Sequence, residues 1–167
     1  MRYAQIRSMD ISNGEGVGIA LFVQGCHLRC YNCFNPETWD FNGGKEWNED
    51  IENQFIELAK RPYIKRVSIL GGEPLADENI QDVLNIVNKI RLLLPDKKIW
   101  LYTGYRFEEC LGHIIRKEII LKCDVLVDGR YVDSQRDITL RWRGSMNQRA
   151  IDVQASLQNK EIVLYDN

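Results

Sequence analysis

The sequence has no hydrophobic run long enough to cross a membrane. Its longest apolar stretches, such as residues 19–23, are far shorter than the ~20 residues that a transmembrane helix needs. The N-terminal residues 1–7 also lack the apolar core of a secretory signal peptide. The cysteines number five, and an odd count fits reduced thiols better than a set of disulfides. We therefore expect a cytoplasmic protein.

The sequence also has little excess of charge of either sign. The net charge of −2 gives no indication of a nucleic-acid or membrane surface. We find no internal repeat, linker or low-complexity segment. The hydrophobic share of 44% is that of an ordinary globular protein, and 167 residues are enough for a substantial core. We expect a single domain that spans residues 1–167.

Three of the cysteines are concentrated in one short stretch. Cys26, Cys30 and Cys33 follow the spacing C-x3-C-x2-C directly after an apolar run at residues 17–23. Soft thiolate ligands select zinc, copper(I) or iron–sulfur clusters. Three cysteines in one loop can hold three irons of a cubane cluster and leave the fourth iron open for a substrate or cofactor.

A structural zinc site is the alternative for these cysteines, because such sites usually have four protein ligands. The available fourth ligands are His27, Cys110, His113 and Cys123. Cys110 lies on an apolar helical face and Cys123 begins a strand, so we expect both to be buried as small hydrophobic side chains. The two histidines form no ligand pattern, and His27 is expected on a loop surface.

Strand-like and helix-like segments alternate along the chain. Apolar runs predict strands at residues 17–23, 67–70, 99–102 and 125–127, with weaker signals at 3–8, 151–153 and 162–164. Helical periodicity predicts helices at residues 49–59, 80–90 and 107–115. This alternation favours a parallel sheet with ligands beyond the carboxyl ends of its strands. A closed eight-stranded barrel typically needs ~250 residues, so we expect an α/β fold with an open, partial barrel.

The cysteine loop resembles that of the radical S-adenosylmethionine (SAM) superfamily. The longer run at residues 25–39 resembles one family in particular, the activating proteins of anaerobic ribonucleoside-triphosphate reductases. The similarity continues in the same order at residues 71–75, 102–105, 124–130 and 142–149. The residue before the third cysteine is often aromatic in the superfamily, whereas Asn32 stands there in this chain.

The resemblance implies a [4Fe-4S] cluster on Cys26, Cys30 and Cys33, with SAM bound beside it. The residues expected at SAM are Asn32, Cys33, Phe34, Gly71, Gly72, Glu73, Pro74 and Thr103. Taken alone, the Gly-Gly-Glu-Pro segment at 71–74 is equally compatible with a tight turn. The residues that are left without a role are Asp128, Arg141, Arg143 and Arg149, which lie in or near a basic stretch that suits either a partner contact or a solvated loop.

The implied activity is that of a radical SAM enzyme that activates a glycyl-radical enzyme. Reductive cleavage of SAM gives methionine and a 5′-deoxyadenosyl radical, which takes the Cα hydrogen of one glycine in the reductase. A flavodoxin or ferredoxin is implied as the electron donor. We expect no catalytic acid or base, because the cofactors carry the chemistry. The alternatives are an activase of the pyruvate formate-lyase type, an electron-transfer protein and a zinc-stabilised binding module.

Overall fold

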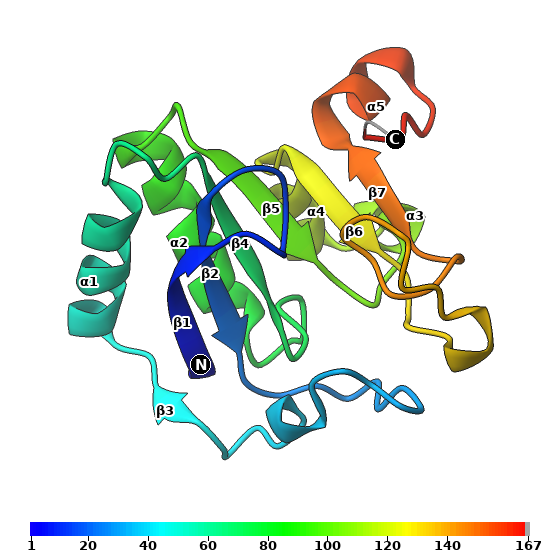
Figure 1. Ribbon diagram of the computed structural model, residues 1–167. Helices are drawn as coiled ribbons and strands as arrows, with labels where there is room; N and C mark the ends of the chain where they lie inside the picture. The colour runs from blue at the N-terminus through cyan, green and yellow to red at the C-terminus, as the bar shows by residue number, and fades with distance from the viewer. Residues whose placement is uncertain (166–167) are drawn as a thin grey trace.

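The computed structural model describes residues 1–165, in which the strands form one mixed sheet and the larger helices pack on one of its faces (Figure 1). Across these residues the strand order is β3-β1-β2-β4-β5-β6-β7. β2, β4, β5 and β6 pair in parallel, and antiparallel pairs add β1 and β3 at one edge and β7 at the other. The strands are β1 (Arg2–Asp10), β2 (Gly18–Val23), β3 (Lys45–Glu46), β4 (Arg66–Gly71), β5 (Lys98–Tyr102), β6 (Val125–Asp128) and β7 (Arg149–Asp152).

The helices lie mainly between the parallel strands in sequence, as βα units require. They are α1 (Glu49–Ala59), α2 (Ile80–Leu93), α3 (Phe107–Leu111), α4 (Ile114–Leu121) and α5 (Val153–Asn159), with the short 3-10 helices η1 (Pro36–Thr38) and η2 (Asp133–Gln135). The predicted start of the first helix is confirmed. The side chain of Asn48 accepts a hydrogen bond from the backbone N–H of Ile51 at 2.9 Å and caps α1.

The two faces of the sheet have different surroundings because successive side chains in a strand point to opposite sides. On one face, strand residues such as Leu21 and Ile69 join the helices in the main hydrophobic core. On the other face, Phe22 and Leu70 belong to a smaller cluster, against which Tyr102 packs. In Figure 1 the loop that follows β1 crosses this second face. This loop covers only part of the second face, and Phe22, Leu70 and Tyr102 on that face line a cavity.

A buried ion pair ties the loop after β1 to the sheet. The guanidinium of Arg66 is fully buried and donates to the backbone oxygen of Asp10 at 2.9 Å and to its carboxylate at 2.8 Å. Burial alone raises the pKa of Asp10, but the Arg66 and Asn13 hydrogen bonds outweigh it and leave the pKa lowered. The Ser68 hydroxyl donates to the backbone oxygen of Asn13 at 2.6 Å. These contacts hold the loop against β4 and bring Asn13 to the cavity.

Most predicted elements are present, and the clearest difference is at residues 107–115. One helix was expected there, but α3 ends at Leu111 and a second helix, α4, begins at Ile114. The chain breaks because His113 accepts a hydrogen bond from the backbone N–H of Arg116 at 3.2 Å and caps α4. Ile114, at the start of the second helix, is 86% exposed.

The end of the chain also differs from the weak strand signals seen in the sequence. β7 ends at Asp152, whose side chain accepts from Ala155 N–H at 3.0 Å and caps α5, so Val153 begins a helix. Leu164 forms an isolated bridge with Ile151. The second predicted strand, at residues 162–164, is thus reduced to a single bridge among the described residues.

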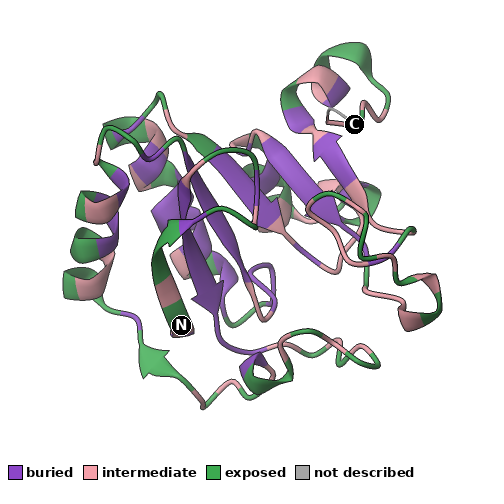
Figure 2. Cartoon of the chain, in the orientation of Figure 1, coloured by how far each residue is buried: buried purple, intermediate pink, exposed green. Residues whose placement is uncertain are grey.

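The expected α/β fold is confirmed. β3 and β7 lie at opposite edges, so the strands of residues 1–165 do not close into a barrel. Figure 2 shows that buried residues are concentrated in the parallel strands, whereas most of the loops beyond their carboxyl ends are exposed or half-buried. No helix in the described chain is both long and apolar enough to span a membrane.

Candidate functional site

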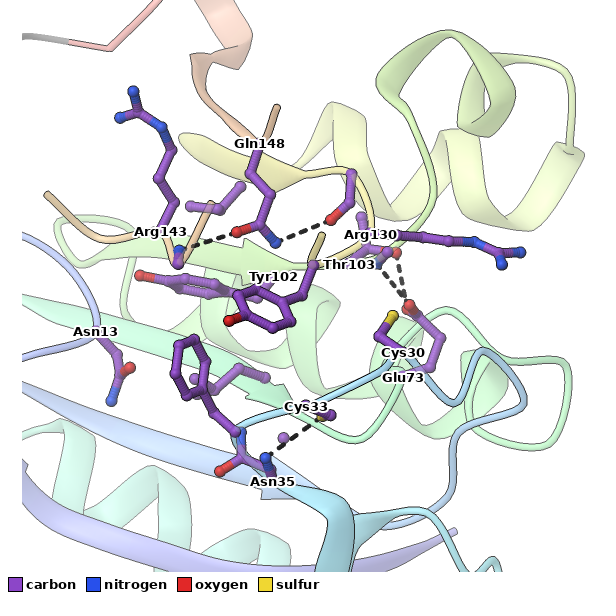
Figure 3. A pocket seen from close by; sticks show the side chains of 18 of the residues that line it. Asn13, Cys30, Cys33, Asn35, Glu73, Tyr102, Thr103, Arg130, Arg143 and Gln148 are labelled. Atoms are coloured by element: carbon purple, nitrogen blue, oxygen red, sulfur yellow. Dashed lines mark hydrogen bonds between the residues drawn. The ribbon is translucent and has the colours of Figure 1, made fainter. Parts of the chain in front are cut away.

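The candidate site is a cavity beyond the carboxyl ends of β2, β4, β5 and β6. Its volume is about 520 Å³, within the ~300–1,000 Å³ typical of small-molecule sites. The floor is the open face of the sheet, through Phe22, Leu70, Tyr102 and Val127. The walls are the cysteine loop, the loops that follow β4 and β5, and the long loop between β6 and β7 (Figure 3). This is the position at which parallel α/β sheets gather their ligands.

The cysteine loop begins after β2, and its last residues pack back against its first residue, Gln24. The Gln24 side chain donates to the backbone oxygens of Glu37 at 2.9 Å and Asp40 at 2.8 Å, which closes the base of the loop. Gly25 has φ +101°, and a Cβ there would lie 2.0 Å from a ring carbon of Phe41. Only glycine fits this position without a shift of the loop. The three cysteines are therefore carried on a loop with a fixed base.

Cys26, Cys30 and Cys33 all line the cavity, and all five cysteines of the described chain are free thiols. Burial raises the pKa of the Cys26 thiol, and the backbone amides of Leu28 and Arg29 partly oppose that rise. Cys33 Sγ accepts a hydrogen bond from the Asn35 backbone N–H at 3.4 Å (Figure 3). Among residues 1–165, no three Cys, His, Asp or Glu side chains already stand as the ligands of one metal ion.

The Gly-Gly-Glu-Pro segment is joined directly to the cysteine loop. The backbone N–H of Gly72 donates to Val23 O at 2.8 Å, and that of Glu73 donates to Gly25 O at 2.8 Å. A Cβ on Gly72 would lie 2.5 Å from Gly25 O, so the two backbones can approach this closely only at glycine. The segment and the cysteine loop therefore form one wall of the cavity.

The Glu73 side chain links this wall to the loop after β5. Its carboxylate is buried and accepts hydrogen bonds from Leu75 N–H at 2.9 Å, the Thr103 hydroxyl at 2.8 Å and Gly104 N–H at 2.7 Å. Burial raises the pKa of Glu73, and these three donors partly oppose the rise. Because every partner is a donor, the carboxyl oxygens act here as acceptors.

Most of the residues expected at SAM lie around this one cavity. Its lining includes Cys33, Phe34, Gly71, Gly72, Glu73 and Thr103. Pro74 is buried behind the wall and is not part of the lining. Asn32 is exposed, with φ +55°, and its amide donates to the Asp133 carboxylate at 3.3 Å. The side chain of Asn32 therefore faces the loop between β6 and β7.

The residues that were left without a role separate into two groups. Asp128 is fully buried and receives two hydrogen bonds from Arg149, at 3.0 and 2.6 Å, and one from Phe107 N–H at 2.8 Å. Arg149 also pairs with Glu108 at 2.9 Å, so both residues join β6 and β7 to α3. Arg143, by contrast, lines the cavity, and Arg141 lies outside the lining with its guanidinium 4.1 Å from the centre of the Trp142 ring. Neither forms an ion pair within residues 1–165.

Several cavity residues were not identified from the sequence. Phe22 and Leu70 could have been found from the alternation of side chains along β2 and β4. Trp39 and Arg143 carry no comparable signal, because long-range packing brings them to the cavity, whereas Tyr102 lies in the segment at residues 102–105 that the family resemblance singles out. Each of these three has a buried side-chain N–H or O–H donor without a partner in the described chain: Trp39 Nε1, Tyr102 Oη and Arg143 Nε. Such unpaired donors fit a ligand that carries hydrogen-bond acceptors.

The fourth ligands considered for a zinc site lie elsewhere in the described structure. Cys110 and Cys123 are fully buried in the main core, as expected. His113 caps α4, and His27 is exposed and contacts Glu78 at 2.6 Å. None of these four side chains lines the cavity in residues 1–165. The soft donors at the cavity are the three loop thiols, a set that fits an iron–sulfur cluster with an open iron.

Comparisons with known proteins identify relatives over most of the chain. Residues 12–151 match a family described as a 4Fe-4S single cluster domain. The chain is 39% identical over 150 residues to the anaerobic ribonucleoside-triphosphate reductase-activating protein of Escherichia coli K12, covering 89% of this chain and 96% of that protein. The protein of the same name from Pasteurella multocida is 37% identical, with 89% and 95% covered. That of Enterobacteria phage T4 is 35% identical over 149 residues, with 89% and 92% covered.

Proposed function

The chain belongs to the family of anaerobic ribonucleoside-triphosphate reductase-activating proteins, and from this we propose that it generates the glycyl radical of such a reductase. The observation that carries the proposal is the convergence of three free thiols, the Gly-Gly-Glu-Pro segment and Thr103 on one cavity. When bound there, a [4Fe-4S] cluster and SAM supply reductive cleavage of SAM to methionine and a 5′-deoxyadenosyl radical, which takes a hydrogen atom from a glycine of the reductase.

The residues of the chain hold and orient these groups. Cys26, Cys30 and Cys33 are the proposed cluster ligands, and the backbone N–H of Asn35 lies at the Cys33 sulfur, where it would tune the reduction potential. Backbone groups of Gly71 and Gly72 are the proposed contacts to the methionine part of SAM. Glu73 holds Thr103 and Gly104 beside them.

The other proposed cofactor contacts come from the cysteine loop. We propose that Phe34 contacts SAM, because Phe34 lines the cavity. Asn32 and Pro74 lie outside the lining, and we propose that they support the loops that carry the SAM contacts. The unpaired donors of Trp39 and Tyr102 suit the acceptor atoms of SAM. No residue is proposed as an acid or base.

The proposal extends to the fold and the partners. The open sheet with cofactors beyond its parallel strands suits a compact, partial barrel of the radical SAM type in a single domain. The partners are the reductase, as the names of the relatives indicate for those proteins, and a low-potential donor such as a flavodoxin or ferredoxin. We also propose a cytoplasmic location, because the cytoplasm keeps thiols reduced and the activity requires a reduced cluster on thiol ligands.

The cluster assignment is tested by anaerobic reconstitution of Cys26→Ala with iron and sulfide. We expect the variant to lose bound iron and sulfide and the EPR signal of the reduced cluster. Cys110→Ala is the matched control, because Cys110 is a buried core residue that is not part of the cavity lining. In the wild type and the control, SAM should change the EPR signal. A colourless protein that retains zinc, or a cluster signal indifferent to SAM, contradicts the proposal.

A further inference from the structure

The loop between β6 and β7 forms one wall of the cavity and is rich in arginine. This segment, residues 129–148, is named here the arginine loop. Its charged residues are Arg130, Asp133, Arg136, Asp137, Arg141 and Arg143, so it is net positive in a chain whose overall net charge is −2. Within residues 1–165 none of the four arginines forms an ion pair. The next arginine along the chain, Arg149, pairs with two carboxylates.

The arginine loop is held in place by its own side chains. Gln148 accepts from the backbone N–H groups of Gly144 and Ser145 at 2.9 and 3.1 Å, and donates to Gly129 O at 3.0 Å. Asn147 donates to Arg130 O at 2.7 Å. Two of the bonds of Gln148 are visible in Figure 3, and together these bonds fix the backbone that carries the arginines.

The arginine loop also packs directly on the cysteine loop. The rings of Phe34 and Tyr131 lie 4.8 Å apart, and a Cβ on Gly144 would lie 2.4 Å from the Phe34 ring. The Arg136 guanidinium lies 5.7 Å from the centre of the Phe34 ring. The positive charge of Arg136, which has no ion pair in the described chain, therefore lies beside the proposed cluster loop.

Exposed apolar side chains accompany the arginines. Ile138 and Met146 of the arginine loop are 85% and 60% exposed, and Tyr31 and Phe34 of the cysteine loop are 77% and 56% exposed. Arginine, methionine and aromatic side chains are the types enriched at protein interfaces. Ile138 also lines the cavity, so the exposed surface is continuous with the cavity wall.

We propose that the arginine loop is the docking surface for an acidic segment of the reductase that flanks its radical glycine. The proposal rests on the proposed function, which requires a glycine-bearing segment to enter this cavity. Carboxylates of that segment would pair with the guanidinium groups of Arg136 and Arg141, because arginine matches carboxylates in geometry as well as charge. Ile138 and Met146 would provide the apolar contacts that give such an interface its stability.

The test is a charge reversal at two arginines that are not part of the cavity lining, Arg136→Glu with Arg141→Glu. We expect the Kd for the reductase, measured anaerobically, to rise at least about tenfold, since the introduced carboxylates would face carboxylates of the partner and repel them. The salt dependence of binding should fall, and glycyl-radical yield at limiting reductase should fall with affinity. SAM cleavage with dithionite in the absence of reductase should remain at the wild-type level.

The matched control is Lys65→Glu with Lys117→Glu, which makes the same change in charge at two exposed lysines outside the cavity lining. This variant should bind the reductase like the wild type. An unchanged Kd in the arginine variant, or an equal loss in the lysine variant, overturns the proposal. A defect seen only when a small acidic electron-carrier protein replaces dithionite also overturns it, because the loop would then serve the donor. Failure of the wild type to cleave SAM would instead contradict the proposed function.

Discussion

At the scale of single residues, Glu73 connects two walls of the cavity through three hydrogen bonds of its carboxylate. It is a buried carboxylate that joins its own segment, through Leu75, to the loop after β5, through Thr103 and Gly104. The sequence pattern identified Glu73 as a cofactor residue. Its contacts with Thr103 and Gly104 could not be predicted, because these residues lie 30 and 31 positions away in the loop after β5 and leave no local signal. The geometry makes Glu73 a positioning residue for two walls of the cavity.

We predict that Glu73→Gln destabilises the protein by about 1–3 kcal/mol, because either orientation of the amide turns its NH2 group toward an existing donor. The measurement is urea unfolding, with Glu46→Gln as the control. Glu46 is exposed on β3, and its substitution should change the free energy of unfolding by less than about 0.5 kcal/mol. Equal stability of wild type and Glu73→Gln would show that the three donors do not depend on a carboxylate.

At the scale of elements, the site depends on the junction between the ends of β2 and β4. These strands are parallel neighbours in register from Gly18 and Arg66 to Val23 and Gly71, so the two loops that follow them begin side by side. The sequence predicted both strands, because each is a short apolar run bounded by polar or glycine residues. It did not predict the break between α3 and α4, which depends on a histidine cap.

We predict that Gly25→Ala weakens this junction, since φ +101° and the close Phe41 ring both exclude a Cβ. The backbone conformation alone costs about 1–3 kcal/mol for a residue other than glycine. The expected result is a lower ratio of bound iron to protein after reconstitution, measured with the thermal stability of the same samples. Gly112→Ala is the control, because its φ is −82° and the nearest atom to its Cβ, Glu109 O, is 3.4 Å away. An iron ratio equal in both variants would contradict this account of the loop.

At the scale of the whole molecule, the sequence predicted the centre of the fold better than its edges. The four parallel strands are apolar runs, so they could be predicted from the sequence. β7 and the bridge at Leu164 are short and depend on pairing with residues far away in sequence, so the sequence gives only a weak signal for them. The three cysteines were identified from their spacing alone. The contact of the arginine loop with Phe34 was not, since an irregular loop has no periodicity from which its packing can be predicted.

The measurement that tests the central claim most directly is transfer of hydrogen from the reductase to the cofactor product. The reductase is labelled with deuterium at the Cα of its glycines and incubated anaerobically with this protein, SAM and a reductant. Generation of a glycyl radical predicts deuterated 5′-deoxyadenosine that accumulates in step with the glycyl-radical EPR signal. Unlabelled 5′-deoxyadenosine without a radical on the reductase, or no cleavage of SAM at all, would contradict the account.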